Sequence, residues 1–213
     1  MKFFETSKYF SLKKSTYLNL RWIAIIGQLI TINTVYFIFG FDSEFFFQNL
    51  IILIGAISNL YLIYIHQRTQ LLDKEASFFL LIDVLQLSAL IYLTGGIANP
   101  FSIFLIVPSI FSSSNLGFKS NLLIVIITSL IIILLTFFYY PLPGEINEHF
   151  HVSVYYYYSI PISLIIALIF LNYFALTFGT ESRLRKEALN KMEEIMSKEH
   201  ELLSLGGQAA AAA

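Results

Sequence analysis

Six apolar runs constrain this 213-residue chain more than any other feature. A helix needs about 20 predominantly apolar residues to cross the hydrocarbon core of a bilayer. The fourth run is the shortest and contains Pro108, so we expect a kink or tilt there. The sequence therefore predicts an all-α membrane protein built on a six-helix transmembrane bundle. Its expected spans cover residues 22–41, 47–65, 77–94, 101–116, 121–140 and 154–178.

The composition excludes several classes of protein. Hydrophobic residues make up 57% of the chain and charged residues 13%, whereas soluble domains are about 45–50% apolar and 25% charged. A net charge of −1 provides no overall positive charge to attract nucleic acid, so we expect no nucleic-acid partner. The chain has no Cys, which removes disulfides, thiolate chemistry and Cys-ligated metals.

The positions of the 13 Lys and Arg residues predict the orientation. All of them lie in the N-terminal segment, the second and fourth loops, or the tail. Cytoplasmic loops carry an excess of Lys and Arg, so an even number of spans with both termini cytoplasmic explains the distribution. We therefore expect a multi-pass membrane protein. The three opposite loops hold no basic residue, only the acidic residues Asp42, Glu44, Glu145 and Glu148.

The predicted spans contain two polar faces. Asp83, their only charged side chain, shares a helix face with Gln86 and Thr94 by three-to-four spacing, and Gln28 and Thr31 form a comparable face on the first span. Intramembrane ionisable residues usually face the bundle interior or a functional site. Two interpretations of Asp83 stay open, namely pairing with another span and a direct functional role. Asp83 precedes Thr94 by 11 residues, roughly 16 Å along a helix, so we expect no contact with a ligand seated beyond Thr94.

The short loop after the third span combines residues that could hold a small ligand. Gly95 and Gly96 free the backbone for positive φ and close approach, and the Asn99 amide can donate and accept hydrogen bonds. Pro100 fixes the start of the next helix, and Phe101 offers a ring for stacking. These groups could clasp a flat polar head whose apolar tail stays in lipid. The alternative is a tight interhelical turn, in which Gly, Asn and Pro are common.

The loop residues 95–101, GGIANPF, resemble the GGxxNPF heptapeptide of the RegB/PrrB/ActS family of redox-responsive sensor histidine kinases. Residues 21–28 and 83–94 are similar to the context of that motif. Residues 203–213 resemble the run before the phosphoacceptor His of the family. The resemblance implies sensing of ubiquinone and ubiquinol, with Gly95, Gly96, Asn99, Pro100 and Phe101 as the quinone contacts.

The resemblance also implies a bacterial inner membrane as the location, and a division of the chain. Residues 1–21 would be a cytoplasmic segment, residues 22–179 the six-span sensor domain, and residues 180–213 a cytoplasmic signalling helix leading into a missing dimerisation and phosphoacceptor domain. In the family the signal sets autophosphorylation and phosphotransfer to a response regulator. We find no ATP-binding boxes after residue 180, so we expect no catalytic residue in this chain. ATP and Mg²⁺ would bind only in the missing kinase domain.

The tail predicts a homodimer. An imperfect seven-residue repeat indicates a helix that pairs with its copy, and the alternative is a merely solvated helix. His200 begins an H-E-L-x-S sequence, but Leu205 replaces the expected Pro, so we interpret it as a helix-surface residue. The repeat residues are Ser182, Leu189, Met196 and Leu203.

The sequence offers two further interpretations. His149 and His151, together with two Glu residues, form only a weak zinc pattern, so we expect no metal site. A small six-span transporter or channel with Asp83 in its site is the alternative function, since Gly95-Gly96 and Pro108 could mark broken helices. The two halves show no evident internal repeat.

Overall fold

Helices account for nearly all of the part of the chain that the computed structural model describes, namely residues 12–41, 43–64, 70–141 and 153–212. The two short strands β1 and β2 pair in antiparallel fashion. In chain order the elements are β1 (Leu12–Lys13), α1 (Lys14–Phe37), α2 (Phe45–Tyr64), β2 (Gln70–Leu71), α3 (Asp73–Tyr92), the 3-10 helices η1 (Gly96–Ala98) and η2 (Pro100–Leu105), α4 (Ile106–Asn115), α5 (Phe118–Phe137) and α6 (Val154–Ala212).

Five of the described helices, α1, α2, α3, α5 and α6, are long and apolar enough to cross a membrane. The predicted fourth span is shorter and changes from the 3-10 helix η2 to α4 just before Pro108. A 3-10 helix rises about 2.0 Å per residue, so η2 and α4 together reach about 27 Å. This length is close to the hydrocarbon thickness of about 30 Å. That the η2–α4 segment also crosses the membrane, which would give six spans, stays a prediction.

Helix boundaries differ from those expected at both ends of the chain. α1 begins at Lys14, well before residue 22, so Arg21 lies within the helix instead of preceding it. α6 covers both the predicted sixth span and the predicted tail helix. The chain divides into two compact units, Met1–Ala175 and Leu176–Ala213.

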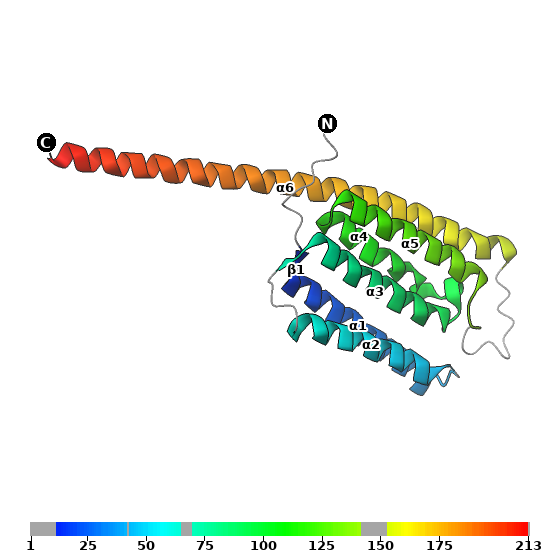
Figure 1. Cartoon of the computed structure of the whole chain (residues 1–213). Coiled ribbons are helices and arrows are strands. Elements are labelled where there is room, and N and C mark those ends of the chain that lie inside the picture. Colours follow the sequence, from blue (N-terminus) through cyan, green and yellow to red (C-terminus); the bar gives the residue numbers. More distant parts are fainter. Residues whose placement is uncertain (1–11, 42, 65–69, 142–152, 213) are drawn as a thin grey trace. The chain divides into compact units, whose positions relative to one another are not determined.

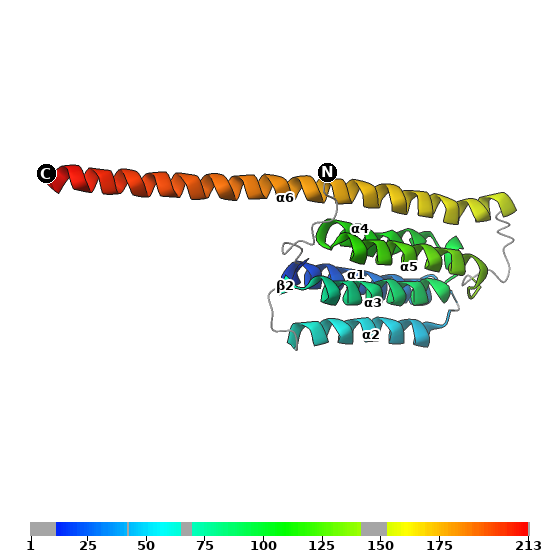
Figure 2. The ribbon, with the colours of Figure 1, turned by 45° about the horizontal axis from the view of Figure 1, so that its top comes forward.

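α3 is the central helix of the first unit. It contacts α2, α4 and α5, and Figures 1 and 2 show these helices lying alongside one another. Its buried apolar side chains include Phe79, Leu80 and Val84. They form one core with residues of α4 and α5 and with Leu164 and Leu168 of α6.

The distribution of polar side chains is the reverse of that in a water-soluble protein. Large apolar residues lie on the outer faces, such as Ile57 at 56% and Phe46 at 72% exposure. Inside, Ser112 of α4 donates to Asn121 of α5 at 2.9 Å. Hydrogen bonds of this kind hold helices together where both lipid and side chains are apolar. The arrangement therefore supports a multi-pass membrane protein.

Candidate functional site

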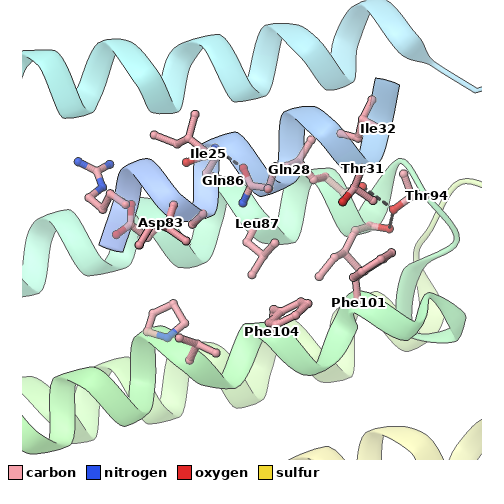
Figure 3. A pocket seen from close by; sticks show the side chains of 18 of the residues that line it. Ile25, Gln28, Thr31, Ile32, Asp83, Gln86, Leu87, Thr94, Phe101 and Phe104 are labelled. Atoms are coloured by element: carbon pink, nitrogen blue, oxygen red, sulfur yellow. Dashed lines mark hydrogen bonds and ion pairs between the residues drawn. The ribbon is translucent and has the colours of Figure 1, made fainter. Parts of the chain in front are cut away.

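A cavity of about 810 Å³ lies between α1, α3 and the η2–α4 segment, with the start of α2 at its edge (Figure 3). Binding pockets for small molecules usually measure about 300–1,000 Å³ and are mostly apolar, with a few placed polar groups. This cavity has that character. The polar side chains that line it are Tyr17, Arg21, Gln28, Thr31, Ser43, Gln48, Asp83, Gln86, Thr94 and Asn99.

A buried ion pair closes one end of the cavity. Arg21 Nε donates to Asp83 Oδ1 at 2.8 Å, and the Tyr17 hydroxyl donates to Asp83 Oδ2. The remaining guanidinium nitrogens donate to Ser58 and Asn59 of α2, at 3.1 and 3.4 Å. Asp83 is therefore paired with another helix, as the first of its two interpretations predicted. The pairing ties α1, α2 and α3 together.

Two glutamines bridge α1 and α3 in the middle of the cavity. Gln86 Nε2 donates to Gln28 Oε1 at 3.1 Å. Gly55 of α2 makes room for this pair, because a Cβ built there would lie 2.4 Å from the Gln86 amide. The polar faces predicted on the first and third spans thus meet each other.

Gly95 and Gly96 shape the loop at the other end of the cavity. Both have positive φ, 100° and 58°, a backbone conformation that residues other than glycine rarely adopt. A Cβ on Gly96 would lie 2.5 Å from the Tyr139 Cβ and 2.6 Å from the Leu135 carbonyl oxygen. Neither glycine lines the cavity. They allow the turn, and Gly96 packs against the end of α5.

Asn99 closes the loop with its own amide. Its Nδ2 donates to the Thr94 carbonyl and hydroxyl oxygens, at 3.0 and 2.6 Å, and its Oδ1 accepts from the Phe101 N–H at 2.8 Å. This is the hydrogen-bond pattern of a helix N-cap, and it starts η2 at Pro100. The nitrogen and the oxygen of the amide are therefore both used within the loop, so Asn99 orients the cavity wall.

The wall that follows Asn99 is aromatic. The Phe101 and Phe104 rings stack with centroids 6.0 Å apart and an interplanar angle of 15°. They are 44% and 50% exposed, so this wall reaches the outer surface of the helices. Figure 3 shows both rings across the cavity from Thr31 and Gln28.

The cavity brings together residues that the sequence placed in separate features. Asn99, Pro100 and Phe101 line it, and so do Gln28, Gln86 and Asp83. Sequence reasoning missed Gln48 of α2, which is 1% exposed and also lines the cavity. Its one signal was an amide in an apolar run.

The histidines do not form a site in the part of the chain that the structure describes. His149 and His151 lie outside the described residues. His200 is exposed on α6. Among the described residues, no group of three or more His, Cys, Asp or Glu side chains could hold a metal ion.

Comparison with known proteins gives one informative relationship. The chain is 27% identical over 199 residues, 93% of its length, to the sensor histidine kinase RegB of Cereibacter sphaeroides. It spans 43% of the length of that relative. No family model matches, and no solved structure matches. Over nearly its whole length, the chain is therefore a distant homologue of a sensor histidine kinase.

Proposed function

We propose that this chain is the membrane sensor and signal-transmitting part of a two-component histidine kinase that reads the redox state of the ubiquinone pool. The observation that carries the proposal is the shared cavity. Asn99, Pro100 and Phe101 of the GGIANPF loop and the polar faces of α1 and α3 line one space of about 810 Å³. The distant homology to a sensor histidine kinase supports the two-component sensor part of the proposal.

The cavity suits a flat ring with polar oxygens and an apolar tail. Aromatic rings favour offset-stacked neighbours, and Phe101 and Phe104 present such a surface. The few polar groups can fix the orientation of a head group. Because both rings are about half exposed, an isoprenoid tail can leave along them into lipid. Ubiquinone and ubiquinol have this shape and chemistry.

α4 offers a route from the cavity to α6. One side of the η2–α4 segment, including Phe104 and Phe111, lines the cavity. Ser109, also on α4, is buried and accepts a hydrogen bond from Asn172 Nδ2 of α6 at 2.9 Å. A ligand that shifts α4 therefore displaces a partner of α6. Interhelical shifts of about 1–2 Å are a common switching device.

In the proposed function, the kinase activity that the sensor controls belongs to a region outside this chain. With both termini cytoplasmic, α6 would carry the signal to a kinase region that phosphorylates itself and then a response regulator. Leu189, Met196 and Leu203 are 60%, 65% and 68% exposed in the single chain. Their seven-residue spacing fits a homodimer through this helix.

Filling the cavity tests the proposed ligand. Leu87 points into the cavity towards Phe104 (Figure 3), whereas Leu85 on the same helix is 55% exposed. In lipid nanodiscs, with partition into empty nanodiscs subtracted, the parent is expected to bind decylubiquinone saturably. Leu87→Trp should weaken this binding at least about tenfold, and Leu85→Trp should leave it within about twofold. Equal binding by both variants would contradict the site.

A further inference from the structure

Gln48 is a buried amide with an unused donor. It lies in the first turn of α2, is 1% exposed and lines the cavity. Its Oε1 accepts from the Ser43 hydroxyl at 3.3 Å. Its Nε2 has no partner among the residues that the structure describes. Buried polar groups are nearly always hydrogen-bonded, so such a group needs an explanation.

Gln48 has an unpartnered polar atom whichever way its side-chain amide is oriented. The two ends of a glutamine amide are assigned from their hydrogen bonds. Ser43 contributes one hydroxyl, so reversing the amide of Gln48 leaves Oε1 unpartnered instead of Nε2. One polar atom of Gln48 is therefore unpartnered beside the cavity in either orientation.

Gln48 lies at the loop end of the cavity. α1 and α3 run in the same direction and α2 runs opposite to them, so the first turn of α2 lies beside the last turns of α1 and α3. Thr94 and Phe101 line the same end. The Asn99 amide is already committed to Thr94 and Phe101. Gln48 therefore holds an unpartnered polar atom at this end, among the described residues that line it.

We infer that Gln48 Nε2 donates the hydrogen bond that holds a ring oxygen of the quinone head. The inference rests on the proposed function and deepens it. The GGIANPF loop then supplies the shape and the aromatic wall, while a residue of α2, outside that loop, supplies the polar recognition. The ligand completes the hydrogen bonding of a side chain that the protein alone leaves unsatisfied.

The test compares two isosteric changes on one helix. Gln48→Met removes the amide at nearly constant volume. Asn49→Leu is the matched control, because Asn49 bonds the Phe45 carbonyl of its own helix and does not line the cavity. Binding of decylubiquinone and thermal unfolding without ligand are measured for both variants and the parent in nanodiscs.

The inference predicts that Gln48→Met weakens decylubiquinone binding about three- to tenfold, the effect of one neutral hydrogen bond. Its unfolding temperature without ligand should equal or exceed that of the parent, since a buried unpaired donor is removed. Asn49→Leu should bind within about twofold of the parent. Unchanged binding by Gln48→Met beside a binding parent would overturn the inference and leave the proposed function standing. A parent that binds no decylubiquinone would overturn both.

Discussion

The Arg21 guanidinium nitrogen Nε lies 2.8 Å from the Asp83 carboxylate and joins α1 to α3 inside the helical unit. The two side chains are only 4% and 18% exposed. A buried pair contributes little net stability, but removing one partner leaves a buried charge without compensation. The pair therefore fixes the relative position of two walls of the cavity.

Asp83→Asn is expected to destabilise the protein strongly, by about 3–5 kcal/mol, because Arg21 keeps its charge and loses its counter-ion. The double variant Arg21→Met/Asp83→Leu should lose much less, since it leaves no buried charge. Unfolding by denaturant in detergent micelles measures both. A double variant that is less stable than Asp83→Asn would contradict this account of the pair.

Gly96→Ala is expected to destabilise the loop by about 1–3 kcal/mol. The new Cβ meets Tyr139 and Leu135, and Gly96 has positive φ. Gly27→Ala is the matched control, because a Cβ there meets nothing within 4 Å. In a helix interior that change should stabilise by up to about 1 kcal/mol. Thermal unfolding of the two variants should shift in opposite directions.

Asn99→Ala should cost about 1–2 kcal/mol, the usual effect of losing an N-cap side chain. Asn99→Asp keeps the acceptor for the Phe101 N–H but sets a carboxylate oxygen against the Thr94 carbonyl oxygen in place of the donor, so its loss should be at least as large. If Asn99→Ala unfolds at the temperature of the parent, the amide does not hold the loop. Unfolding of the three proteins side by side makes the comparison.

The tail dimer can be tested by cysteine cross-linking, because the chain has no Cys of its own. Met196→Cys lies in the seven-residue repeat and should form an intermolecular disulfide under mild oxidation. Lys191→Cys lies on another face of the same helix and should cross-link far less. Equal yields at the two positions would indicate a solvated helix without a specific partner.

The same cross-link reports on signal transmission. Decylubiquinone should change the yield of the Met196→Cys disulfide if the cavity is coupled to α6. Asn172→Leu removes the bond to Ser109, so it should abolish that change while decylubiquinone binds within about twofold of its usual strength. A ligand effect that persists in Asn172→Leu would mean that the coupling takes another route.

The local features of the site followed from the sequence, whereas contacts between helices did not. Three-to-four spacing predicted the polar faces of Gln28 and Gln86, and a tight turn was one of the two interpretations that the loop composition left open. The burial of Arg21 could not be predicted, since its place among other basic residues is also typical of a cytoplasmic segment. Gly55 carried no signal and Gln48 only that of an amide in an apolar run, because the significance of both depends on which side chains of neighbouring helices face them.

Photoaffinity labelling with an azido-ubiquinone tests whether a quinone binds in the cavity. The 213-residue chain in lipid bilayers is irradiated, and labelled peptides are identified by mass spectrometry. We expect the label at cavity residues such as Thr31, Phe101 and Phe104, and we expect an excess of decylubiquinone to prevent this labelling. Label spread over outward-facing residues such as Phe170, 65% exposed, and insensitive to decylubiquinone would contradict a quinone site in this cavity.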